Sequence, residues 1–298
     1  MHITNQQKQT KKFFESNSSN WARKARSKSR YSVNVIKQRN QYVEDISSTF
    51  LNKNAKTLDV GCGTGDLVIR LLKKKYDAYG IDFASSMIKK ARFESKKQGF
   101  SPDRFILNSI FELSLDTKFN LISANGFLEY ISEKEFDAFI KKSNQLLTND
   151  GLLVLGSRNR LFNVFSYNNF TDEEIKKGSI IQLIKECTLF NSIKSFKELL
   201  KKNFIPTISS NLQTHAYTGI KVKSRYQYTP CQIIQKLRQN GFQPIDVIPI
   251  NIHILTTSAR SIIPEIHDYT SNYLQKRREL YLNVIPQSSS FMITAKKK

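Results

Sequence analysis

Cysteine is scarce in this chain of 298 residues, and the three that occur, Cys62, Cys187 and Cys231, lie far apart. Their number and spacing do not predict a disulfide framework or a zinc site, and we expect no metal. They favour a reducing, cytoplasmic compartment. Glycine and proline are also few, at 11 and 7 residues, which excludes collagen and proline-rich linker proteins.

Long apolar runs are missing as well. No segment approaches the roughly 18 consecutive apolar residues of a membrane span. The N-terminal stretch lacks the apolar centre of a secretory signal, so we expect no such signal. Hydrophobic residues nevertheless make up 39% of the chain, which is enough to build a core and argues against wholesale disorder.

Acidic residues are too few to balance the basic ones. The chain has 25 Asp and Glu against 47 Lys and Arg, a formal net charge of +22. Such a charge attracts anions, among them nucleic acid, acidic membrane surfaces and phosphorylated substrates. A general bias toward Lys, Asn, Ile and Ser explains the same charge without any function. Nucleic acid and a peripheral membrane contact therefore stay open as partners, and neither is favoured.

Short apolar segments alternate with helical patterns from residue 57 onward. This alternation predicts an α/β fold with a Rossmann-like, mostly parallel sheet and helices on both faces. We expect strands at 57–60, 79–83, 104–107, 119–124, 152–157, 242–250 and 289–295. We expect helices at 66–75, 85–98, 133–147 and 229–240, the second of them capped by Ser85 or Ser86.

Two interruptions of this rhythm define the domain organisation. The predicted units are an N-terminal helical cover (1–56), a core (57–157 and 229–298), a first helical insertion (158–228) and a second insertion (252–285). Within the insertions we expect helices at 171–187, beginning with a cap at Thr171, at 191–202 and at 264–283. Because ligands of such sheets bind at the carboxyl edge, we expect both insertions to form a lid there.

The segment from Leu58 to Gly65 reads LDVGCGTG and forms a strand-to-helix turn. Its glycines allow positive φ and let the backbone approach a ligand, while the following helix N-terminus offers unpaired N–H groups. Asp82 ends the next predicted strand, where a carboxylate can accept hydrogen bonds from both hydroxyls of a ribose.

This Asp-x-Gly-x-Gly-x-Gly turn, followed by Asp82, resembles the first motif of class I S-adenosylmethionine-dependent methyltransferases. The resemblance covers most of residues 57–157, with weaker support up to the last strand. Segment 122–130 is similar to the loop after the family's fourth strand, and segment 13–21 to its helical cover over the cofactor. The resemblance implies a seven-stranded sheet with an antiparallel last strand, and S-adenosyl-L-methionine as cofactor.

The resemblance also implies roles for individual residues. The three glycines contact the methionine and ribose, Asp59 fixes the loop and reaches the methionine amino group, and Asp82 binds the ribose. Phe83 packs on the adenine, and Ser109, where the family often has Asp, accepts a bond from the adenine amine. The implied cofactor-binding set is Asp59, Gly61, Gly63, Gly65, Asp82, Phe83, Ser109, Ile110 and Asn125.

The sequence does not identify a catalytic base. His215 and His253 are weak candidates, and Arg158 and Arg160 join them as polar groups expected to face the acceptor. The resulting hypothesis is an enzyme that transfers a methyl group to oxygen or nitrogen of a small-molecule or lipid-linked metabolite. An RNA methyltransferase and a non-catalytic cofactor-binding protein of the same fold stay open as alternatives.

Overall fold

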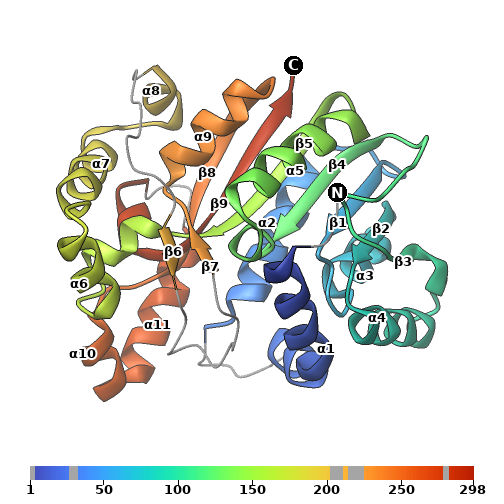
Figure 1. Cartoon of the computed structure of the whole chain (residues 1–298), viewed down its shortest axis with the longest axis horizontal. Helices are drawn as coiled ribbons and strands as arrows, with labels where there is room; N and C mark the ends of the chain where they lie inside the picture. Colours follow the sequence, from blue (N-terminus) through green and yellow to red (C-terminus); the bar gives the residue numbers. More distant parts are fainter. Residues whose placement is uncertain (1–3, 27–32, 202–210, 214–224, 278–281) are drawn as a thin grey trace.

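The computed structural model describes residues 4–26, 33–201, 211–213, 225–277 and 282–298. Its centre is a seven-stranded sheet in the order β3-β2-β1-β4-β5-β9-β8 (Figure 1). The strands are β1 (Lys56–Val60), β2 (Asp77–Asp82), β3 (Phe105–Leu107), β4 (Phe119–Asn125), β5 (Leu147–Arg158), β8 (Phe242–Ile252) and β9 (Ser288–Lys297). Strands β1 to β5 run parallel, and β9 is antiparallel to both of its neighbours. The predicted fold class and antiparallel last strand are confirmed.

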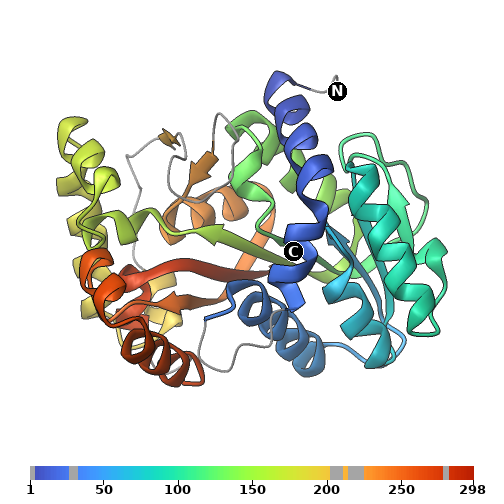
Figure 2. The ribbon, with the colours of Figure 1, turned by 90° about the horizontal axis from the view of Figure 1, so that it is seen from below.

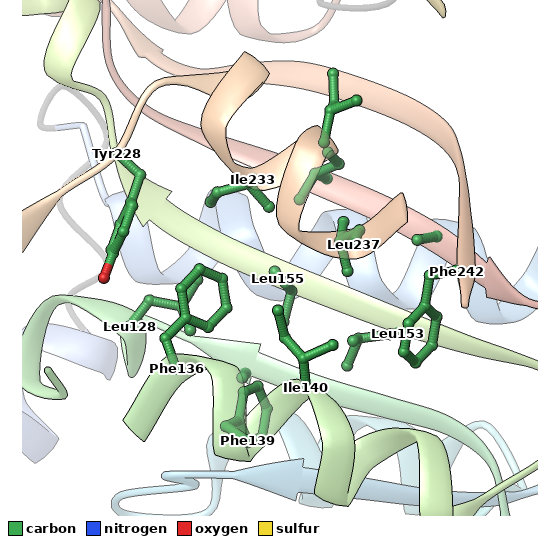
Figure 3. Close-up of a cluster of buried hydrophobic side chains, with 14 of the residues drawn as sticks. Leu128, Phe136, Phe139, Ile140, Leu153, Leu155, Tyr228, Ile233, Leu237 and Phe242 are labelled. Atoms are coloured by element: carbon green, nitrogen blue, oxygen red, sulfur yellow. The ribbon is translucent and has the colours of Figure 1, made fainter. Parts of the chain in front are cut away.

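Helices cover both faces of the sheet, as the alternation predicted. One face carries α5 (Glu133–Leu146) and α9 (Pro230–Gln239), and the other carries α2 (Val35–Phe50), α3 (Asp66–Lys73) and α4 (Ser85–Lys97). Side chains of α5 and α9 meet over β5 and β8 (Figure 3).

Buried strands β5 and β9 send alternate residues into the two halves of the core, because successive side chains of a strand point to opposite faces. Leu153 and Leu155 enter the α5 side, whereas Leu152 and Val154 enter the α2 side. Both faces of β5 are apolar, which explains why the sequence of this strand reads as one continuous apolar run.

The order of the sheet reverses between β1 and β4, and ligands of doubly wound sheets bind outside the carboxyl ends of the strands at such a point. Here Asp59 of β1 stands in register with Ser123 of β4. The glycine turn follows β1, and η2 (Leu128–Tyr130) follows β4. The topology thus brings both predicted motifs to one place.

The N-terminal segment forms the long helix α1 (Asn5–Arg26), followed by α2. Figure 2 shows α1 crossing in front of the sheet beside α2 and α4. The cap predicted for α4 is wrong: Ala84 is its N-cap and makes no side-chain bond. Instead the carboxylate of Glu15 in α1 accepts hydrogen bonds from the backbone N–H groups of Ser85 and Ser86, at 2.6 and 2.8 Å.

The first insertion contains α6 (Asn169–Lys176), α7 (Ile180–Ser192) and α8 (Phe196–Lys201). The single helix predicted at 171–187 is wrong, because Gly178, at φ +67°, ends the first of two helices. The predicted cap is also displaced: Asn168 caps α6, and Thr171 answers it from the third helical position in a capping box. A short ladder, β6 (Asn211–Gln213) with β7 (Arg225–Gln227), follows.

The second insertion contains α10 (Thr257–Ile262) and α11 (Pro264–Gln275), so the helix predicted at 264–283 is shorter than expected. The helices of both insertions lie toward the β8 edge of the sheet, whereas α3 and α4 lie toward its opposite edge, which is formed by β3 (Figure 1). No helix within the described ranges has the length and apolar character needed to cross a membrane.

Candidate functional site

Two adjoining cavities lie at the carboxyl ends of the central strands. The first has a volume of about 100 Å³ and the second of about 320 Å³. Their linings share five residues: Trp21, Gly61, Gly63, Asn125 and Gly126. The glycine turn and the loop after β4 therefore form the boundary between the two cavities, and α1 covers it.

The glycines of the turn have different surroundings. Gly63, at φ +52°, borders both cavities, and a Cβ there would point at the Trp21 ring, 3.8 Å away. Gly65, at φ +80°, is among the described residues and lines neither cavity. A Cβ at Gly65 would lie 2.6 Å from the Phe105 ring, so this glycine lets the turn pack closely against β3.

Asp82 ends β2 beneath the first cavity and is 8% exposed. One carboxylate oxygen accepts a bond from the Gly63 N–H at 3.0 Å, and the other from the Ala84 N–H at 2.9 Å. Burial raises its pKa to about 6, although these backbone bonds favour the charged form. The carboxylate is fixed in place with lone pairs left for a further donor.

Asp59 lies below the glycine turn and accepts a hydrogen bond from the Ser123 hydroxyl at 2.8 Å. Burial raises its pKa to about 7, and the negative charge of Asp82 adds to this effect. Within the described part of the chain, neither Asp59 nor Asp82 has an ion-pair partner. Two buried carboxylates without a cation are suited to a cationic ligand.

The first cavity has largely apolar walls with polar groups at its rim. The predicted residues Phe83, Ser109, Ile110 and Asn125 all line it. The Ser109 hydroxyl accepts a bond from the Phe111 N–H at 3.3 Å and still has a proton and a lone pair to offer. The sequence did not single out these further lining residues: Gln7, Thr10, Met87, Asn108 and Phe127.

Helix α1 is tied across this cavity at several points. Near its start, Gln7 donates to the Glu135 carboxylate at 2.7 Å, and in its middle Glu15 holds the first turn of α4. At its end Arg26 pairs with Asp66 and Glu94, at 3.1 and 2.8 Å. Between these ties, Phe14 and Trp21 present aromatic faces to the cavity.

The second cavity has a basic wall. Arg39 of α2, Arg158 at the end of β5 and Arg225 of β7 all line it, together with the carboxylate of Glu129. Glu129 pairs with Arg225 and lies 3.8 Å from the Arg39 guanidinium. Arg39 also donates to the Ser290 hydroxyl at 2.6 Å. Arg39 ends a basic stripe of the sequence, Arg23 to Arg39, a pattern most often found on a solvated face, and no sequence signal singled out Arg225.

Of the two predicted histidines, the one that the structure describes does not stand at this site. His215 lies outside the described residues. His253 lines neither cavity and is 8% exposed. The centre of its ring lies 4.5 Å from that of Phe162 and 4.9 Å from that of His267. Burial lowers its pKa to about 3, so it is neutral at physiological pH. Arg160 likewise faces inward, in a buried pair with Glu174 at 2.8 Å.

The site fits S-adenosylmethionine. Phe83 and Ile110 offer apolar walls for an adenine, and the fixed carboxylate of Asp82 offers acceptors for ribose hydroxyls. Asp59 and Asp82 have no cation of their own among the described residues, whereas this cofactor carries an ammonium and a sulfonium charge. Gly63 leaves the boundary between the cavities free of a side chain.

A family model described as "Methyltransferase domain" matches residues 51–218. The carboxy-S-adenosyl-L-methionine synthase of Nautilia profundicola is 33% identical over 116 residues, which is 38% of this chain and 49% of that protein. The ubiquinone biosynthesis O-methyltransferase of Pelagibacter ubique is 31% identical over 109 residues, 36% and 44% of the two chains. This chain thus spans about half the length of these curated relatives.

Among solved structures, the magnesium protoporphyrin IX methyltransferase of Synechocystis with bound S-adenosylhomocysteine is similar at a TM-score of 0.57 and 14% identity, covering 99% of this chain and all of that one. At this identity the likeness shows the fold alone. The family match covers more than half of the chain, and the predicted recognition and cofactor are confirmed. The chain belongs to the methyltransferase-domain family, the class I enzymes whose cofactor is S-adenosylmethionine.

Proposed function

We propose that this protein transfers a methyl group to an oxygen or nitrogen atom of a small-molecule or lipid-linked acceptor. The observation that carries the proposal is the pair of joined cavities, which differ in their walls. The first has apolar walls above a fixed carboxylate, and the second is larger and basic. Two compartments that meet at the glycine turn suit a cofactor and a separate acceptor.

The cofactor would lie across the boundary. Asp82 would accept bonds from the ribose, Phe83 would pack on the adenine, and Ser109 would accept a bond from the adenine amine. Asp59 would stabilise the methionine ammonium, directly or through water, and Gly61 and Gly63 would lie under the methionine. S-adenosylmethionine supplies a methyl group on a sulfonium sulfur, open to attack by a lone pair.

The protein's contribution to the transfer is alignment of the acceptor with that methyl group, together with exclusion of water. Trp21 lines both cavities and Tyr130 lines the first, and Glu129 is a carboxylate in the lining of the second, the proposed acceptor compartment. A base is needed only when the attacking atom must lose a proton. The names of both curated relatives refer to small-molecule chemistry, which supports a small acceptor over RNA.

The test combines binding with transfer. Calorimetry should show S-adenosylmethionine and S-adenosylhomocysteine binding to the whole protein. With methyl-labelled cofactor, a cell extract separated into small-molecule, lipid and RNA fractions should receive label in one of the first two. The Asp82→Ala protein is the control for label that arises without the site. Label confined to RNA would replace the proposal by the RNA alternative, and absence of cofactor binding would overturn it.

A further inference from the structure

Three arginines from distant parts of the sequence converge on the second cavity: Arg39, Arg158 and Arg225. They come from α2, β5 and β7, so their meeting is a product of the fold. We propose that this cluster binds an acidic group of the methyl acceptor, a carboxylate or a phosphate. The inference rests on the proposed function, since it assumes that the acceptor occupies the second cavity.

Two of the arginines, Arg39 and Arg225, are buried, and Arg158 is half-buried. Arg39 and Arg225 are 8% and 4% exposed. The pKa of Arg39 and of Arg158 is lowered to about 10 and that of Arg225 to about 9; burial is the main cause for all three, and the positive charge of Arg39 contributes for the last two. All three stay protonated at neutral pH. Buried guanidiniums that repel one another are stabilised by an anion placed between them.

Among the described residues that line this cavity there are three arginines and two carboxylates. Glu129 serves two of the arginines, as partner of Arg225 and at 3.8 Å from Arg39. The other lining carboxylate, Asp66, already pairs with Arg26 and accepts a bond from the Thr64 hydroxyl at 2.7 Å. The described lining of the second cavity therefore carries a net positive charge, which favours a negative ligand.

The cofactor does not remove this excess. Its carboxylate can pair with one guanidinium, but its ammonium and sulfonium add two positive charges, so the site becomes more positive when the cofactor binds. Asp59 and Asp82, which oppose the cofactor's charge, lie below the turn and at the first cavity. An acidic acceptor restores the balance on the arginine side.

A buried hydroxyl stands beside the cluster. Tyr130 is 6% exposed, and its ring lies 5.2 Å from the Arg225 guanidinium. Its hydroxyl has no hydrogen-bond partner among the described residues. Burial raises the pKa of the phenol, and the charges of Arg158 and Arg39 act against that increase, which places the hydroxyl within their field. It can donate to an anion held by the arginines, and orphaned buried donors of this kind favour a polar ligand.

The experiment uses the full chain saturated with S-adenosylhomocysteine and two simple probes, acetate and inorganic phosphate, at constant ionic strength. The single tryptophan, Trp21, lines both cavities and reports binding by its fluorescence. We expect saturable binding of at least one probe, weakened about tenfold or more by Arg158→Met and largely restored in Arg158→Lys. The tighter probe distinguishes a carboxylate site from a phosphate site.

Two further variants keep the result interpretable. Arg277→Met removes an exposed arginine that stacks on Tyr273 in the second insertion, and it should leave probe binding unchanged. Tyr130→Phe removes only a hydroxyl and should weaken the probe several-fold, even if Arg158→Met fails to fold. Equal probe affinity in the wild type, Arg158→Met and Tyr130→Phe, or no saturable binding, with S-adenosylhomocysteine still bound, would overturn the anion site. Loss of cofactor binding by the wild type would instead overturn the proposed function.

Discussion

The two cavities are neighbours, yet they are built in opposite ways. The first is assembled mostly from residues between Val60 and Ile131, and among its described lining residues the one charged side chain is the carboxylate of Asp82. The second draws three arginines from α2, β5 and β7, and its two lining carboxylates come from α3 and η2. The contrast matches the two ligands of the proposed function: a cationic cofactor needs negative charge, and the basic half suits the proposed acidic acceptor. The predictions below test whether the two halves are as independent as this description requires.

The largest expected effect is on the first cavity. Asp82→Ala removes a carboxylate that the proposed function places on the ribose, where charge-assisted hydrogen bonds contribute about 1.5–3 kcal/mol each. Calorimetry should therefore show an affinity for S-adenosylhomocysteine reduced at least about tenfold. Asp103→Ala, an exposed carboxylate beside β3, is the matched control. Equal affinities in the two variants would mean that Asp82 serves only the turn.

The next effect lies outside both cavities, in the second insertion. His253 is buried against His267, with Arg260 and Asp268 nearby, and burial lowers its pKa to about 3. The unfolded chain binds a proton near pH 6.5 and the folded chain does not, so stability present above pH 6.5 is lost as the pH falls. The free energy of unfolding should decrease by up to about 1.4 kcal/mol for each pH unit below 6.5.

Denaturant unfolding at pH 7.5, 6.0 and 5.0 measures this decrease. His253→Gln should reduce the slope, although His267, whose pKa burial also lowers, keeps part of it. Affinity for S-adenosylhomocysteine should not differ between His253→Gln and the wild type at any of these three pH values, because His253 lines neither cavity. A change in cofactor affinity in this variant would show that the insertion and the first cavity are coupled.

The same contrast explains what the sequence could predict. Leu152 to Leu155 is a continuous apolar run, and Asp82 ends a strand before a helix, so local patterns were sufficient to predict the sheet and the place of Asp82. The other predicted lining residues of the first cavity were implied by the family resemblance. Arg39 is buried through the packing of α2, and a basic stripe does not reveal which of its members turns inward. Glu15 caps a helix 70 residues away, and Gly178 divides a helix whose apolar pattern continues past it.

A smaller effect is expected from the carboxylate below the turn. Asp59→Asn keeps the acceptor for Ser123 but removes a buried charge that has no cation among the described residues. At pH 8 this change should stabilise the free protein, by an amount on the order of 1–2 kcal/mol, because an uncompensated buried charge opposes folding. The same change should weaken cofactor binding, since it removes the charge that the proposed function assigns to the methionine ammonium. A lower melting temperature for the variant would contradict this account.

Asp59 also predicts a pH dependence of binding. Its pKa of about 7 in the free protein means that below pH 7 it carries a proton, which must leave for the ammonium to be paired. Affinity for S-adenosylhomocysteine should therefore fall as the pH is lowered from 8 to 6, and Asp59→Asn should remove most of that slope. Asp82, whose pKa is about 6, adds a further loss near pH 6 that persists in the variant.

The smallest expected effect tests the helix that covers both halves. Glu15 places a carboxylate on the first turn of α4. A carboxylate that caps a helix N-terminus typically contributes about 1 kcal/mol to stability. Glu15→Gln should weaken this tie of α1 while Gln7 and Arg26 still hold its two ends, so affinity for S-adenosylhomocysteine should fall only a few-fold. Hydrogen exchange should become faster in α1 and unchanged in α9. Ser16→Ala, whose hydroxyl bonds only within α1, is the neighbouring control. Faster exchange without any loss of affinity would show that α1 covers the cavities without contributing to cofactor binding.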